Sequence, residues 1–239
     1  MSDAERRIFD ELAAPLLEDV FKSHVEDGYV EVSNRKPEDI VLEFERQIKK
    51  LIDEGIGWRS VIDHTPNLLR RAEREIENES FEIAATFYAL WIEHTVNGYL
   101  ISALLRKGYD SEVATPLIRE LRIKTKITAL WKLVGYPDFT DDDIKTIEQV
   151  TQARNAYVHY KWPAHDEATA DNLRDQLRSH VAQARNLEAA FKKAADALLW
   201  NGRKDEIIGF FHEHMRQRRQ KRFGSSPSSA DPAASPPSS

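Results

Sequence analysis

The chain of 239 residues contains no cysteine, which excludes disulfide bonds, thiolate zinc sites and cysteine nucleophiles. Only nine residues are glycine and 31% are charged, a composition that favours helices over sheets. Uninterrupted apolar runs of membrane-spanning length are also missing, because Glu93, His94 and Asn97 break the most apolar stretch, at about 83–105. The charged N-terminus lacks the apolar core of a signal peptide. We therefore expect a soluble, cytoplasmic protein without a membrane partner.

The net charge of −6 argues against a protein that coats nucleic acid by bulk electrostatics, so any contact with RNA needs a local basic patch. One candidate patch lies near the C-terminus and consists of Arg216, Arg218, Arg219, Lys221 and Arg222. It could bind RNA or an acidic partner protein, or it could be the solvated end of a helix. A Gly-rich phosphate loop and a nucleophile elbow are both absent from the sequence.

Helical spacing of apolar residues, interrupted by proline and glycine, predicts an all-α protein. We expect helices at about 3–24, 37–54, 66–78, 80–107, 116–134, 141–159, 167–200 and 204–222, and a short extended piece at 28–33. Residues 1–78 would form an N-terminal helical accessory region, and residues 79–223 a helical bundle with a basic final helix. Residues 224–239 are mostly serine, proline and alanine, so we expect a disordered tail.

The stretch from Arg154 to His159, at the expected end of the 141–159 helix, points most clearly at chemistry. Arginine presents forked donors that suit a phosphate, and histidine exchanges protons near neutral pH. Asn155 and His159 are four residues apart and share a helical face. Five residues apart on a straight helix, Arg154 and His159 diverge by roughly 140°. Two copies related by a twofold axis could bring the two side chains together, so the spacing suggests a homodimer.

Several polar and aromatic residues could support this site. Glu93 and Asn97 share a face of the 80–107 helix, and Arg154 is a plausible partner for Glu93 across a helix pair. The other supporting candidates are His94, Tyr157 and Lys161. The alternative for the Glu93 cluster is a structural network that sets the register of the helices.

A simpler interpretation of the motif stays open. Arg154 and His159 could be an ordinary pair of cations at a helix end, since the same spacing also occurs at Arg59–His64 and, more loosely, at Arg174–His180. A metal site at His212 and His214 is disfavoured, because helical residues two apart point in nearly opposite directions. We therefore expect no metal and no cofactor.

Arg154, Asn155 and His159, at the end of a bundle helix, resemble the Arg-polar-x3-His motif of the HEPN superfamily. The resemblance covers about residues 81–200 and implies an HEPN-like helical bundle. Many members are metal-independent endoribonucleases that dimerise to form a shared active site, and many belong to toxin–antitoxin or anti-phage systems. The resemblance implies an RNA substrate and an antitoxin or regulatory protein as a further partner.

Carried over to this chain, the resemblance assigns a role to each motif residue. Arg154 would bind the scissile phosphate, and Asn155 would orient the Arg154–His159 pair or the phosphate. His159 would act as general base on the ribose 2′-hydroxyl or as general acid on the leaving oxygen. The alternative is a non-catalytic HEPN-type module that binds a partner, a nucleotide or RNA.

Overall fold

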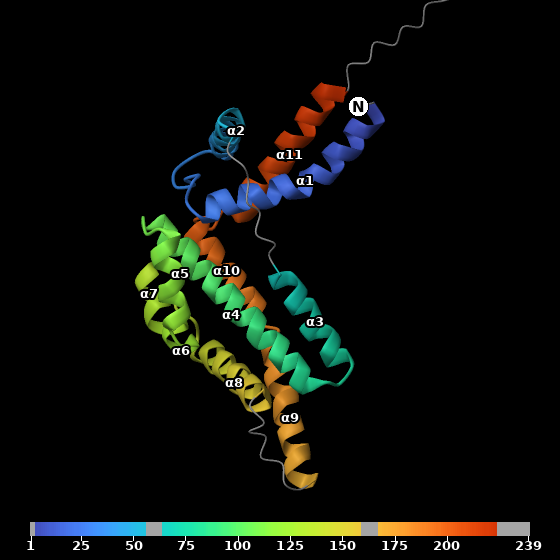
Figure 1. Cartoon of the computed structure of the whole chain (residues 1–239), viewed down its shortest axis with the longest axis vertical. Coiled ribbons are helices and arrows are strands. Elements are labelled where there is room, and N and C mark those ends of the chain that lie inside the picture. Colours follow the sequence, from blue (N-terminus) through green and yellow to red (C-terminus); the bar gives the residue numbers. More distant parts are fainter. Residues whose placement is uncertain (1–2, 56–63, 159–166, 224–239) are drawn as a thin grey trace, which may run out of the picture.

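The computed structural model describes the backbone of residues 3–55, 64–158 and 167–223, and the side chains of 15–55, 64–158, 172 and 174–221 (Figure 1). Throughout these ranges the regular structure is helical and no strand occurs, which confirms the predicted all-α class. The elements are α1 (Asp3–Glu26), α2 (Pro37–Asp53), α3 (Thr65–Glu77), α4 (Phe81–Arg106), α5 (Ser111–Glu120), α6 (Ile123–Thr125), the π-helical turn η1 (Lys126–Leu130), α7 (Trp131–Val134), α8 (Asp141–Val158), α9 (Glu167–Ala184), α10 (Leu187–Leu199) and α11 (Lys204–Phe223). No helix in the described ranges is long and apolar enough to cross a membrane.

Helix α4 is the centre of the molecule, with α3, α5, α8, α9 and η1 packed around it (Figure 1). Its side chains Tyr88, Ile92, Val96 and Leu100 are fully buried. Packing from several sides explains why its apolar residues do not form a single narrow stripe. One polar face carries Glu93, His94 and Asn97, and of these Glu93 and His94 are exposed.

Three sequence-based expectations about the elements were wrong. The expected 116–134 helix is interrupted: α5 begins at Ser111, because the Asp110 carboxylate accepts a hydrogen bond of 2.9 Å from the Val113 amide and caps the helix earlier. The backbone is extended at Leu121, where α5 ends. The expected 167–200 helix is divided between α9 and α10. Residues 28–33 form turns and coil, since Gly28 has a φ of 82° that suits a turn.

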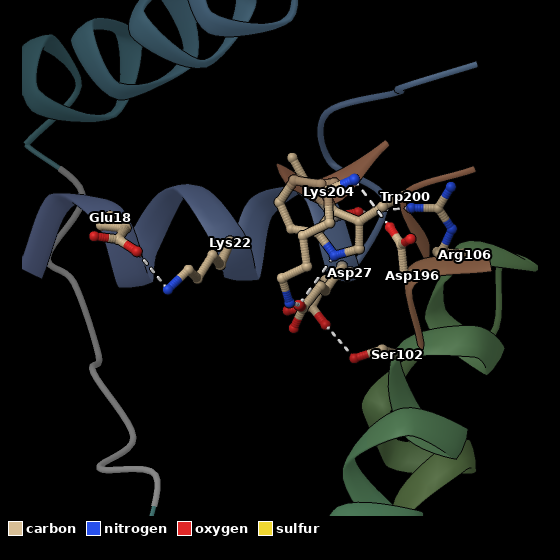
Figure 2. Close-up of polar contacts among 10 residues, drawn as sticks. Glu18, Lys22, Asp27, Ser102, Arg106, Asp196, Trp200 and Lys204 are labelled. Carbon is tan, nitrogen blue, oxygen red and sulfur yellow. Dashed lines mark hydrogen bonds and ion pairs between the residues drawn. The ribbon is translucent and has the colours of Figure 1, made fainter. Parts of the chain in front are cut away.

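A set of polar contacts joins α1 to the turn between α10 and α11, as Figure 2 shows. The Glu26 carboxylate accepts hydrogen bonds from the Trp200 indole at 3.2 Å and from the Lys204 ammonium at 3.1 Å. Nearby, the Asp27 carboxylate accepts a hydrogen bond of 2.8 Å from the Ser102 hydroxyl of α4. Trp200 is fully buried, so its indole N–H needs this partner.

Helices from both sides of the expected boundary at residue 78 pack together. Helix α3 lies along α4, and α11 lies beside α1 and α2 (Figure 1). Phe211 of α11 stacks on Phe21 of α1 with their ring centroids 4.6 Å apart, and Phe44 of α2 meets Phe21 edge-on at 5.1 Å. The predicted tail at 224–239 lies outside the described residues.

Candidate functional site

Helix α8 carries the arginine of the candidate site, and its start explains its position. The Thr140 hydroxyl donates to the Asp143 carboxylate over 2.7 Å, and the Asp143 amide donates to the same hydroxyl over 3.1 Å. This reciprocal pair of hydrogen bonds caps the start of α8. Ile147 and Val150 are fully buried and fasten one face of α8 to the core.

Arg154 lies one turn after Val150, so it continues the buried face of α8 to the end of the core. Its side chain is half-buried, and its Nη1 donates to the Asn155 side-chain oxygen over 2.9 Å. Asn155 and Tyr157 are exposed. The described residues place a neutral amide, and no carboxylate, against this guanidinium. Within the described part of the chain, its charge is therefore not neutralised by a carboxylate.

The predicted proton-transfer residue follows directly after α8. His159 comes after Val158, the last residue of the helix, but His159 and Lys161 lie outside the described residues. The structure consequently brings together Arg154 and Asn155 of the predicted catalytic set. The position of the histidine relative to them stays a prediction.

The predicted partnership between Glu93 and Arg154 was wrong. Glu93 and His94 are exposed on the polar face of α4, and Arg154 bonds to its neighbour Asn155. Asn97, on the same face, accepts a hydrogen bond of 2.8 Å from the Lys126 ammonium. The polar face of α4 is therefore paired with η1, and not with the end of α8.

Lys126 is the residue of this network that sequence reasoning missed. Its side chain is only 2% exposed, and burial lowers its pKa, while the charge of Glu93 acts in the opposite direction. Lys126 opens the π-helical turn, a widened geometry that is frequent at functional sites. A signal was present in the sequence: Lys126 stands between Ile123 and Leu130 at the spacing of the buried face.

The basic run of α11 is partly neutralised by carboxylates. Arg216 pairs with Glu213 at 2.5 Å, and Arg218 pairs with Glu45 of α2. Arg219 and Lys221 also interact with other residues, and the side chain of Arg222 lies outside the described set. These pairs hold α11 beside α2, which favours a packing role for at least Arg218.

The two histidines of α11 have separate partners. His212 pairs with Glu18 of α1 at 2.9 Å, and His214 pairs with Glu45 of α2 at 3.0 Å. The hydrogen bond from Lys22, supported by His212, lowers the pKa of Glu18. Across the described residues, no group of three or more metal-ligating side chains could hold a metal ion.

Comparison of the chain with known proteins returned no match. No family model matches the sequence, and neither a curated protein nor a solved structure is significantly similar to it.

Proposed function

We propose that the protein is a metal-independent endoribonuclease whose site is built on the last turn of α8. The observation that supports it is the Arg154 guanidinium, which is half-buried, bonded to a neutral amide and one helical turn before the end of a helix that leads into His159. Arginine in this setting can stabilise the charge of a pentacoordinate phosphate. The resemblance of the motif to HEPN ribonucleases supports the same chemistry.

The proposed reaction is attack by the ribose 2′-hydroxyl on the adjacent phosphorus. A base, His159, takes the proton of the 2′-hydroxyl as the 2′-oxygen–phosphorus bond forms. The bond from phosphorus to the 5′-oxygen breaks, and that oxygen receives a proton from an acid. The products are a 2′,3′-cyclic phosphate and a 5′-hydroxyl. Arg154 binds the phosphate oxygens throughout, and Asn155 holds the guanidinium in place.

Incubation of the purified chain with total RNA in EDTA tests this function. We expect cleavage that survives EDTA and is lost in Arg154→Ala and His159→Ala, with cyclic phosphate ends detected by mass spectrometry. Arg119→Ala serves as the matched control, because Arg119 is an exposed arginine on α5. Absence of cleavage for every RNA tried, or cleavage that is unchanged in His159→Ala, would overturn the proposal.

The proposed site is shared between two copies of the chain. Since Arg154 and His159 diverge by roughly 140° on a straight helix, a second copy supplies the missing side chain at each phosphate. Mixing Arg154→Ala chains with His159→Ala chains tests this point. A mixed dimer retains one intact pair, so mixing inactive variants should restore part of the activity. Activity that stays at the level of the separate variants contradicts a shared site.

A non-catalytic interaction module is the second candidate function. The exposed side chains of Tyr157 and Val158, 44% and 45% exposed at the end of α8, favour it because they offer an apolar contact surface. In this case Tyr157→Ser weakens binding of a partner, whereas His159→Ala leaves it unchanged.

A further inference from the structure

Two arginines of α9 share an aromatic support at the start of α4. The guanidinium carbons of Arg174 and Arg178 lie 5.8 and 6.0 Å from the ring centroid of Phe81. The ring is largely buried, at 6% exposed, so it is a fixed platform. Four residues apart, the two arginines project from one face of α9. Cation–π contacts of this kind hold a guanidinium in place while its N–H donors stay available.

The positive charge of this pair is only partly compensated. Arg174 meets Glu79 at 3.3 Å, but the side chains are 53% and 76% exposed, so the ion pair is weak. Arg178 is exposed and makes no ion pair with any of the described residues. Asp175, the next residue after Arg174, points about 100° away from it around the helix. The arginine pair thus presents more donors than its surroundings accept.

The arginine pair lies on a helix that packs against the helix of the candidate site. Helices α8 and α9 pack against each other, and both pack against α4. The C-terminal end of α8 lies next to the start of α4 (Figure 1). Phe81, at that start of α4, carries the arginine pair, so the pair lies at the same end of the bundle as Arg154.

We propose that Arg174 and Arg178 bind neighbouring phosphates of the RNA strand whose scissile phosphate lies at Arg154. This inference rests on the proposed ribonuclease function and assigns it a substrate-binding surface. The two side chains start about 6 Å apart along α9, a separation suited to successive phosphates of one strand. Phosphate contacts of this kind position a strand without reading its sequence. An RNA strand is favoured over an acidic peptide because the pair lies at the same end of the bundle as Arg154, where the proposed function places a scissile phosphate.

Binding of an RNA oligonucleotide that carries 2′-deoxy substitutions, and so cannot be cleaved, tests the proposal by fluorescence anisotropy. The double variant Arg174→Gln/Arg178→Gln should weaken binding at least tenfold at low salt. The slope of log Kd against log salt should fall by about 1.4, at about 0.7 per phosphate contact on a single strand. Arg119→Gln/Arg122→Gln, which changes two exposed arginines at α5, is the matched control and should bind as the wild type does.

A second variant separates charge from folding. Arg174→Lys/Arg178→Lys keeps both charges, so it should keep most of the salt slope. Unchanged binding in the glutamine variant, or an equal loss in the control pair, would overturn the proposal. Equal arginine-dependent affinity for polyglutamate would also overturn it, because the surface would then select acidic chains in general.

The outcomes also separate this proposal from the ribonuclease function. Arginine-dependent binding without cleavage of the natural RNA refutes the nuclease and retains the phosphate-binding surface. Cleavage by the glutamine variant with unchanged KM retains the nuclease and refutes the surface.

Discussion

The Lys126 ammonium donates a hydrogen bond of 2.8 Å to the side-chain oxygen of Asn97, which joins the π-helical turn to the polar face of α4. Asn97 belongs to the most apolar stretch of the sequence and Lys126 is buried beside Ile127, so each gives the other a polar partner. The hydrogen bond contributes to stability, but burial of the charged ammonium costs free energy and offsets part of that contribution.

Replacement of Lys126 by methionine should leave the melting temperature at pH 7 unchanged or higher. Methionine keeps the length of the buried chain and removes the desolvation cost, and the half-buried Asn97 can bond to water instead. Lys126→Ala should lose about 2 kcal/mol or more, because it leaves a cavity. Lys132→Met, at an exposed lysine, is the control. Equal losses in Lys126→Met and Lys126→Ala would show that the ammonium itself is stabilising.

The stability difference between wild type and Lys126→Met should depend on alkaline pH. Burial lowers the pKa of Lys126 below its usual 10.5, so the unfolded chain binds this proton more tightly than the folded chain. The wild type is therefore penalised at neutral pH, and the penalty shrinks as pH rises through the folded pKa towards 10.5. Urea unfolding at pH 7 and at higher pH measures the change. A difference that is constant with pH contradicts the burial of the charge.

His180 should make the protein less stable in mild acid. Burial and, secondarily, Lys145 lower the pKa of His180 below its usual 6.5, so the unfolded state binds this proton more readily. Stability falls as pH drops below 6.5 towards the folded pKa. In His180→Gln the urea midpoint should fall less between pH 7.5 and 5.5 than in the wild type. Identical pH profiles for the two proteins would exclude this role.

Trp200→Phe should lower the free energy of unfolding by about 1–2 kcal/mol, since it removes a buried indole donor from the Glu26 carboxylate. Phenylalanine keeps one six-membered ring and loses the five-membered ring of the indole, so a small cavity adds to the loss. Tyr29→Phe, at a side chain that is 65% exposed, is the control and should change stability little. Chemical unfolding monitored by circular dichroism measures both. A loss no larger than that of the control would mean that the indole–carboxylate bond contributes nothing.

Asn155 variants test how Arg154 is held, given the proposed ribonuclease. Asn155→Ala should lower kcat about tenfold without changing the melting temperature, because Asn155 is exposed and bonds only the guanidinium among the described residues. Asn155→Asp should lower cleavage further, since a carboxylate would neutralise Arg154. Gln152→Ala, at an exposed residue on the same helix, should cleave normally. Wild-type activity in Asn155→Asp contradicts phosphate binding by Arg154.

Helix α8 was predictable because its signals are local. Thr140 and Asp143 are three residues apart and form the cap between themselves, and Ile147 and Val150 carry the apolar period. The division of the 116–134 region was not predictable from the same rules. Asp110 and the proline at 116 both mark helix starts, and only Asp110 caps the helix, with Pro116 inside it. Competing local signals are resolved by packing of the whole segment against α4.

By itself, the sequence determined the all-α class, the helix that carries Arg154 and the polar interruption of α4, because capping, helical period and composition act between neighbouring residues. Tertiary structure decided the partners between helices: Lys126 for Asn97, and Phe81 beneath Arg174 and Arg178. A helical pattern shows which side chains share a face, but not which other helix lies opposite. That choice depends on how the helices pack around α4.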